Sequence, residues 1–451
     1  MARAQPFRIR TLALPFYLPA ALAAIGKGMI MPVIPLFARS FGAGVGTAGA
    51  MVGMLPLGAI IANIPAGYLV ERIGRRNAML LGIAAEALFI VLAATTRSIP
   101  LLAVTLMAAG AAHSVTDIAR LSLFRQIVPQ SHRGRAIALL GGEFRLGGSA
   151  GPIFGGFIAS VLGFRAAFIA DASVLAVAFL ATLLWLPASL GSPATGARRV
   201  PIGDRAADDR RSPVGAEAAA EATAAHPNGD LTPGIATSVL AGIRRSLHIL
   251  RTRWKVFATA CLAIFLLSLV RIGRQSIFPL WGEAIGIDVA QIGLIFGIMN
   301  GVELALFYPA GMVMDRFGRK ATAVPCMSIL GAALFFLPFV GSFGGFAIVA
   351  IAAGLGNGTG AGINMTLSTD FAPADRPGEF IAIWRTLSDS GSVAGPTIVG
   401  LVAASFGLAA APAVIGAAGL AGALIMLFLV PEPTRRFRSH PEGKRSMLPT
   451  K

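Results

Sequence analysis

The chain alternates between long apolar stretches and short polar breaks rich in Arg, Gly and Pro. Each stretch is close to the roughly 20 residues that a helix needs to cross a bilayer. Treating the breaks as loops predicts twelve spans. Six lie near residues 11–38, 47–70, 78–96, 99–127, 136–160 and 166–187, and six near 255–281, 289–314, 321–340, 344–369, 379–404 and 407–430. The pattern predicts an all-α membrane protein with twelve transmembrane helices.

Composition supports this interpretation. Of the 451 residues 55% are hydrophobic and 13% are charged, against roughly a quarter charged in soluble domains. Residues 188–253 contain few large apolar side chains, so we expect them to form a largely disordered cytoplasmic linker. This linker would join six-helix bundles at 1–187 and 254–430, and residues 431–451 would form a cytoplasmic tail. Without a folded soluble domain, we expect no enzyme activity, catalytic residue, cofactor or metal site. A cleaved signal peptide is the alternative for the first stretch, which is long for one.

The cations predict the orientation. The net charge is +17, and Lys and Arg accumulate in loops retained in the cytoplasm. With the N-terminus inside, the outer loops contain only Arg39, Arg97 and Arg165. We therefore expect both termini to be cytoplasmic, with the protein in the cytoplasmic (inner) membrane. This bias and attraction to the lipid bilayer account for the charge without a nucleic-acid partner.

An internal repeat is the strongest signal in the chain. The segment at 65–76, PAGYLVERIGRR, recurs at 309–320 as PAGMVMDRFGRK, shifted by 244 residues. The same shift takes Gly151-Pro152 to Gly395-Pro396, and Lys27 to Arg271. Parallel duplication of six helices predicts two similar bundles that face each other across a central axis, with a site near the bilayer midplane.

These motifs resemble those of the major facilitator superfamily of secondary transporters, and the resemblance covers essentially every span. The loop motif of that family is matched twice, with Glu71 where the family prefers Asp and Val313 where it prefers Leu. The span at 136–160 resembles the motif of proton-coupled drug antiporters, with Ala138 replacing its usual earlier glycine. Twelve spans favour the twelve-helix drug:proton antiporter branch.

The resemblance implies roles for both motifs. The loop motif would be a conformational latch, in which Glu71 meets the positive N-terminus of the helix starting near Glu379; the alternative is that its arginines only enforce topology. Its residues are Gly67, Glu71, Arg72, Gly74, Arg75, Gly311, Asp315, Arg316, Gly318 and Arg319. The antiporter-like motif would seal a proton leak, whereas close helix packing is the simpler explanation. Its residues are Gly147, Gly151, Pro152, Gly155 and Gly156.

Ionisable groups inside spans are costly and therefore candidates for function. In the family, the first, fourth, seventh and tenth helices line the central cavity. The candidates on these helices are Lys27, His113, Asp117, Arg120, Arg271, Arg274, Asn357 and Asn364. His113, Asp117 and Arg120 share one helical face. With Asp117 as the single clear acid, the cavity should be electropositive and favour anionic or zwitterionic solutes; alternatively, these charges pair with acids as neutral scaffold.

Three functional hypotheses follow. The first is proton-coupled efflux of small organic compounds by alternating access, in a protein expected to be a monomer. His113 and Asp117 are the first candidates for the proton site, with Glu303 and Asp389 behind them. The second is uptake or exchange of a small organic anion, which the paired cations suggest. The third is a receptor or scaffold that transports nothing.

Overall fold

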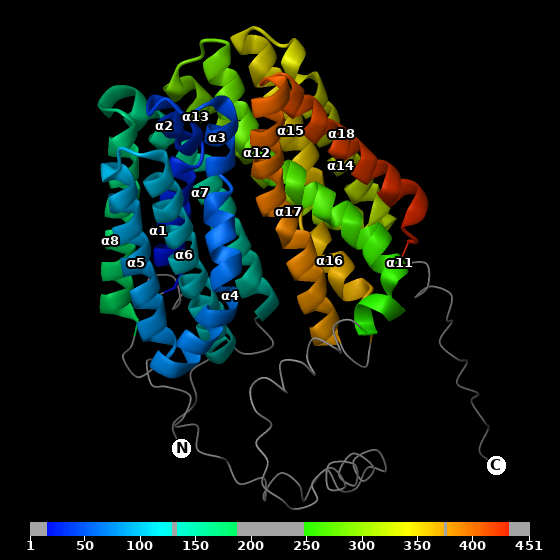
Figure 1. Cartoon of the computed structure of the whole chain (residues 1–451). Coiled ribbons are helices and arrows are strands. Elements are labelled where there is room, and N and C mark those ends of the chain that lie inside the picture. Colours follow the sequence, from blue (N-terminus) through cyan, green and yellow to red (C-terminus); the bar gives the residue numbers. More distant parts are fainter. Residues whose placement is uncertain (1–15, 129–132, 187–247, 374–376, 433–451) are drawn as a thin grey trace, which may run out of the picture.

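Two sets of six helical segments make up the fold (Figure 1). The computed structural model describes residues 16–128, 133–186, 248–373 and 377–432. The first set is α1 (Leu18–Ile30) with α2 (Val33–Ser40), α3 (Val45–Met51) with α4 (Met54–Ile73), α5 (Arg75–Thr95), α6 (Ile99–Ile127), α7 (Arg133–Leu162) and α8 (Phe164–Trp185). The second is α11 (Trp254–Val256) with α12 (Leu262–Ala284), α13 (Val289–Phe317), α14 (Lys320–Phe336), α15 (Phe343–Thr359) with α16 (Ile363–Asp370), α17 (Pro377–Phe406) and α18 (Ala410–Leu424). These ranges contain no strand, so the predicted all-α fold is confirmed.

Length and composition suit most of these helices to a membrane. In the described ranges nine helices are long and apolar enough to cross it, or ten if α1 and α2 form one bent span. The two long helices that do not meet this test, α7 and α17, carry charged residues along their length, including Arg145 and Asp389. The predicted linker and tail lie mostly outside the described residues, so the domain boundaries remain a prediction.

The contacts reproduce the repeat. In the first bundle Arg76 Nη2 donates to the carbonyl of Leu183 at 2.9 Å. In the second, Lys320 Nζ donates to the carbonyl of Leu427 at 2.7 Å. Both residues of the second contact lie 244 positions beyond those of the first, so the two halves fix the end of their last helix in the same way. Each bundle also buries a core of its own.

Several spans that the sequence predicts as continuous are divided, α3 from α4 among them, and two of these breaks have a clear local cause. At Met31-Pro32 the axis bends by 42° between α1 and α2, because proline removes a backbone donor and clashes with the preceding turn. The tenth span breaks between α15 and α16, where Gly362 has φ +78°. Glycine tolerates this left-handed conformation, and the break leaves the carbonyl of Gly360 available to a side chain.

The bundles are closed against each other at one end of the molecule. There Ser276 Oγ of α12 donates to the carbonyl of Gly49 in α3 at 2.8 Å. Gly46 of α3 also lies against Gly400 of α17, with no space for a Cβ atom on either residue. At the other end α4 and α17 diverge (Figure 1). The structure therefore describes a conformation that is closed at one face only.

An ion pair joins the bundles at this closed end. Arg39 Nε lies 3.3 Å from Glu283 Oε2, and both side chains are more than a third exposed. Arg39 Nη1 also donates to the carbonyl of Ala43 at 2.8 Å, which fixes the guanidinium. The two residues of the pair are 244 positions apart and hence equivalent in the repeat.

We expect Glu283→Gln to favour opening at this end by roughly 0.2–1 kcal/mol, the usual value of an exposed ion pair. In this variant, thiol-reactive labelling of single cysteines introduced near Gly44 should become faster. The charge exchange Arg39→Glu with Glu283→Arg should restore the original labelling rate. Equal rates in the wild type and Glu283→Gln would mean that the pair does not contribute to closure.

Candidate substrate cavity

A cavity of about 310 Å³ lies between the bundles. Helices α1 and α7 contribute one wall, and α12, α13 and α15 contribute the other. Among the described residues its charged and amide lining is Lys27, Arg145, Arg271, Arg274, Gln275, Asn300, Glu303 and Asn357. The candidates Lys27, Arg271, Arg274 and Asn357 therefore meet at one site, as their placement on cavity-lining helices predicts.

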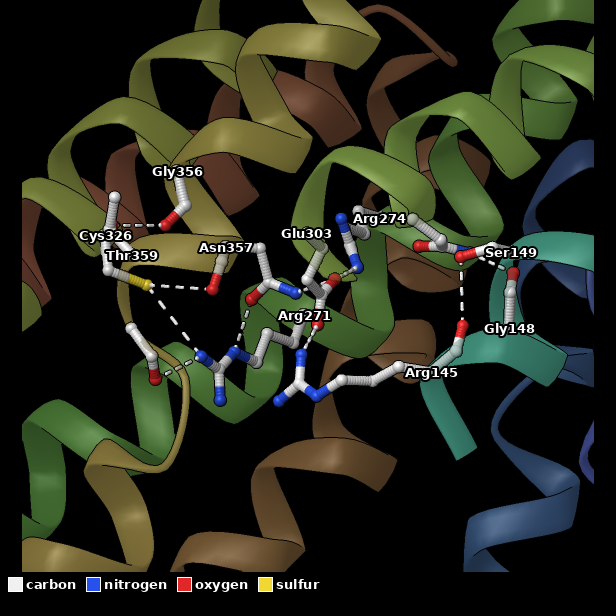
Figure 2. A network of polar contacts seen from close by, with 12 residues as sticks. Arg145, Gly148, Ser149, Arg271, Arg274, Glu303, Cys326, Gly356, Asn357 and Thr359 are labelled. Carbon is white, nitrogen blue, oxygen red and sulfur yellow. Dashed lines mark hydrogen bonds and ion pairs between the residues drawn. The ribbon is translucent and has the colours of Figure 1, made fainter. Parts of the chain in front are cut away.

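Glu303 of α13 is the centre of a polar network (Figure 2). Its Oε1 lies 2.9 Å from Arg145 Nη1 of α7, and its Oε2 lies 3.0 Å from Arg274 Nη2 of α12. Asn357 of α15 donates from Nδ2 to the same Oε2. Arg145 also lies over the ring of Phe307, 4.2 Å from its centroid, a favourable cation–π position. One carboxylate thus holds side chains from three other helices and both bundles.

Arg271 is held by neutral groups. Its Nε donates to Asn357 Oδ1 at 2.6 Å, and its Nη2 donates at 3.0 Å to the carbonyl of Gly360, at the break in the tenth span. Hydrogen bonds to these oxygens therefore orient the guanidinium, and no described carboxylate lies within ion-pair distance of it.

Lys27 is the second cation of the cavity without an ion pair to a described carboxylate. Its side chain is half-buried and lines both the main cavity and a smaller one. Within the part of the chain that the structure describes, its amine forms no ion pair or hydrogen bond. Lys27 and Arg271 are repeat-equivalent, so each bundle presents one such cation to the cavity.

The acid of the cavity differs from the one expected. Asp117 lines neither cavity, whereas Glu303 lines the main one. Four cations therefore face one described carboxylate there. Cations outnumber carboxylates in this lining, and the candidate acid in it is on α13 rather than on α6; the preference for anionic solutes remains a prediction.

Arg274 combines burial with unused donors. The residue is 4% exposed, and its Nε and Nη1 atoms have no hydrogen-bond partner among the described residues. A buried donor without a partner costs roughly 1–3 kcal/mol. Gln275 Oε1, on the next residue, is also without a partner. This wall therefore contains two buried donors of Arg274 and one buried acceptor of Gln275 that have no described protein partner and could bind a polar ligand.

His113 belongs to a separate chain of charges in the first bundle. Its Nδ1 lies 2.9 Å from Glu86 Oε1, and its Nε2 lies 3.3 Å from Asp117 Oδ2. Arg120 Nη2 lies 2.6 Å from Asp117 Oδ1. The predicted common face of His113, Asp117 and Arg120 is therefore present, and Glu86 extends it onto α5.

A smaller cavity, about 30 Å³, lies beside this chain. Its lining includes Lys27, His113, Arg120 and Glu143. Glu143 Oε2 is buried without a partner in the described residues. Lys27 lines both cavities, as do Ala24 and Phe144, so the two cavities share a wall beside the His113 chain.

Asn364 and the pair on α17 lie elsewhere. Asn364 accepts from Trp384 Nε1 at 2.8 Å and lines neither cavity. It fixes α16 to α17. Arg385 Nε and Asp389 Oδ2 of α17 are 3.9 Å apart and both side chains are well exposed, so their ion pair is loose.

The two copies of the loop motif differ in their contacts. In the second copy Arg319 Nε lies 2.8 Å from Asp370 Oδ2, and this hydrogen bond raises the pKa of Arg319 above its ordinary value. In the first copy Glu71 is exposed and forms no ion pair with any described residue. Gly74 and Gly318 take φ +84° and +99° at the turns that end α4 and α13. No other atom lies near the Cβ position of Gly67 in this conformation, and the latch itself remains a prediction.

The other latch residues are Arg72, Arg75, Gly311, Asp315 and Arg316. Arg72 is exposed and Arg75 is half-buried. Asp315 is 3.9 Å from Arg319 Nη1, and Arg316 lies over the ring of Phe317. Gly311 faces open space. These contacts lie within one bundle.

The glycines of α7 form two packing faces. Gly147, Gly151 and Gly155 lie against the backbone of α1, without space for a Cβ atom. Gly156 faces the other bundle, where an added Cβ would lie 2.8 Å from Gly293 Cα of α13. Pro152 lines the main cavity. The motif thus packs its own bundle and the interface, while a role in sealing a proton leak remains untested.

Arg145 and Glu303 were not among the predicted cavity residues. They lie on the fifth and eighth spans, which the resemblance does not assign to the cavity lining. Both are charged residues inside predicted spans and of opposite sign, and a search for such pairs between spans would have found them.

The comparisons agree with this architecture. The sequence model of the Major Facilitator Superfamily matches residues 16–272 and 260–450. The chain is 25% identical over 179 residues to the probable sulfoacetate transporter SauU of Cupriavidus necator, covering 40% of this chain and 42% of that one. It is 31% identical over 168 residues to the class E tetracycline resistance protein of Escherichia coli, covering 37% and 41%. These matches span less than half the length of each relative.

Solved structures share the fold. A POT family transporter in complex with 5-aminolevulinic acid superposes with a TM-score of 0.70 at 13% identity, covering 93% of this chain and 95% of that one. The peptide transporter POT in complex with sulfate gives 0.68 at 15%, covering 93% of each chain. With the family model matching nearly the whole chain, the protein belongs to the Major Facilitator Superfamily.

Proposed function

We propose that the protein carries small organic anions across the cytoplasmic membrane by alternating access. The observation that carries the proposal is the cavity lining, in which Lys27 and Arg271 have no carboxylate partner among the described residues. Uncompensated charge inside a membrane protein is costly. An anionic cargo would compensate both cations at once and contact both bundles.

The same arrangement suggests how cargo binding promotes the conformational change. Lys27 lies on α1 of one bundle and Arg271 on α12 of the other. An anion between them attracts both bundles, which favours closure around the cargo. With both termini in the cytoplasm, as the distribution of cations predicts, the diverging end of the bundles opens to the cytoplasm.

Proton-driven efflux of small organic compounds, by a monomer, is the second candidate. The tetracycline resistance relatives and the antiporter-like glycines of α7 favour it. His113, with carboxylates on both ring nitrogens, is the group we assign to proton exchange in that mechanism. In this case an inward proton gradient drives cargo out.

Flux measurements in proteoliposomes test the first candidate. The panel contains sulfoacetate and succinate as anions, tetracycline, and a lipophilic cation, each with and without an imposed pH gradient. We expect flux of an anion in the wild type and at least a tenfold loss in Lys27→Ala and in Arg271→Ala. Arg385→Ala, on an exposed cation outside both cavities, should retain full flux.

The outcomes separate the candidates. Lys27→Arg should recover part of the anion flux, because it restores the charge but not the shape. Full anion flux in both alanine variants would exclude the proposed anion site. Export of tetracycline with no anion flux would favour the second candidate.

A further inference from the structure

Two consecutive residues of α12 carry buried polar atoms that no described protein group satisfies. Arg274 is 4% exposed, and its Nε and Nη1 atoms have no hydrogen-bond partner among the described residues. Gln275 Oε1 is also buried without a described partner. Glu303 accepts only from Nη2 of Arg274, at 3.0 Å (Figure 2). Both residues line the main cavity, so a ligand in this cavity is their available partner.

The two residues do not satisfy each other. Arg274 offers donors and Gln275 an acceptor, yet no hydrogen bond joins these atoms. Buried polar atoms are nearly always hydrogen-bonded, because leaving one unpaired costs free energy. The side chains line one cavity from neighbouring positions of one helix, so we expect a single small ligand group to reach both. Such a group has to accept from a guanidinium and donate to an amide oxygen.

This requirement selects among the polar groups of organic molecules. A carboxylate or sulfonate only accepts hydrogen bonds, so it suits Arg274 and is repelled by Gln275 Oε1. An ammonium group only donates, and the guanidinium repels it. A hydroxyl group donates one hydrogen bond and accepts others, so it matches both residues. It does so in either orientation of the Gln275 amide, because it complements an oxygen and an NH₂ group equally.

The cation for the anionic group lies one helical turn away. Arg271 precedes Arg274 and Gln275 by three and four positions, a spacing that places side chains on one helical face with Cβ atoms roughly 5–6 Å apart. A hydroxyl and an anionic group that bind at such a separation belong to one small molecule. Ile272 and Phe296 also line this cavity and provide apolar contact for a carbon skeleton.

We propose that Arg274 and Gln275 form a hydroxyl-binding subsite, so that the cargo is a small hydroxylated organic anion such as a short hydroxy acid. This inference rests on the proposed transport of anions and names the class of anion. Lys27 and Arg271 bind the anionic group. The cargo hydroxyl accepts from Arg274 and donates to Gln275, while Arg274 keeps its contact with Glu303. An anion without the hydroxyl leaves both polar groups facing hydrocarbon, which is the source of discrimination.

Anions that share a carbon skeleton and differ by one hydroxyl test the inference. Calorimetry on the purified full chain in lipid nanodiscs compares butyrate with 2-, 3- and 4-hydroxybutyrate, and succinate with malate. For the wild type we expect malate and at least one hydroxybutyrate to bind about tenfold or more tightly than the parent anion, because the hydroxyl bonds to a charged donor in a buried site. Aspartate, whose ammonium group only donates, should bind no more tightly than succinate.

A substitution on each side of the interface between α12 and α13 identifies the residue responsible. Gln275→Met removes the amide at nearly the same length, so it should reduce the preference for the hydroxylated anions to within about threefold. Gln291→Met makes the matched change at an exposed glutamine of α13 that lines neither cavity, and it should retain the wild-type preference. Gln275→Leu serves as a second variant, and the melting profile of each verifies its folding.

Three results would overturn the inference. The first is equal binding of parent and hydroxylated anions to the wild type, which would mean that Arg274 and Gln275 hold bound water only. The second is a tenfold preference that persists in folded Gln275→Met or Gln275→Leu, and the third is aspartate binding as tightly as malate. Failure of the proposed function is a different result: none of these anions binds the wild type, or Lys27→Ala and Arg271→Ala bind them as tightly as the wild type.

Discussion

Gly151→Val is expected to remove most of the folded protein from the membrane. At Gly151 of α7 an added Cβ atom would lie 2.6 Å from Gly28 Cα and 2.7 Å from Gly28 C of α1. These are backbone atoms of another glycine, so no side chain can move aside. Forcing larger groups into packed contacts costs about 3 kcal/mol at the upper end of the usual range.

The measurement is the yield and melting temperature of a fluorescent fusion after detergent extraction. Gly142→Val is the matched control, since Gly142 lies in the same helix with no atom near its added Cβ, and it should retain the wild-type yield. A wild-type melting temperature for Gly151→Val would contradict the close packing of α1 and α7.

Arg274→Met should destabilise the second bundle by about 3 kcal/mol, because it leaves the buried Glu303 with less compensation. Arg274 is 4% exposed and contributes one of the two ion pairs of that carboxylate. Arg145 and Asn357 remain, which is why we expect the lower end of the range for broken buried pairs. Thermal unfolding in nanodiscs measures the change.

A double variant identifies the cause. Glu303→Gln in the Arg274→Met background removes the uncompensated charge and should recover more than half of the lost stability. Arg385→Met, at an exposed and loose pair, should change the melting temperature little. If the double variant is no more stable than Arg274→Met, then the loss comes from packing rather than from charge.

The fold could be predicted from the sequence because span length and an internal repeat are encoded locally. The bend at Met31-Pro32 and the break at Gly362 were not predicted, because each lies within an apolar stretch whose pattern predicts one continuous helix. Gly362 depends on a backbone angle that only the packed structure determines.

The candidate site was predictable where the repeat constrained it. Lys27 and Arg271 occupy matching positions, and the structure brings both to the cavity. Arg145 was not predicted in the cavity lining, and Glu303 was predicted only as a reserve proton site, because their place in the lining depends on the rotation of α7 and α13 about their axes. Asn364 was expected in the cavity but binds Trp384, since the break in the tenth span redirects α16.

The Arg39–Glu283 contact bears on the ancestry of the molecule. An ancestral homodimer of two identical halves would have placed the same residue at both positions, so that arginine opposed arginine or glutamate opposed glutamate. Like charges repel, and attraction between these positions required each half to mutate independently. Duplication of the half therefore preceded the present attraction between these two positions.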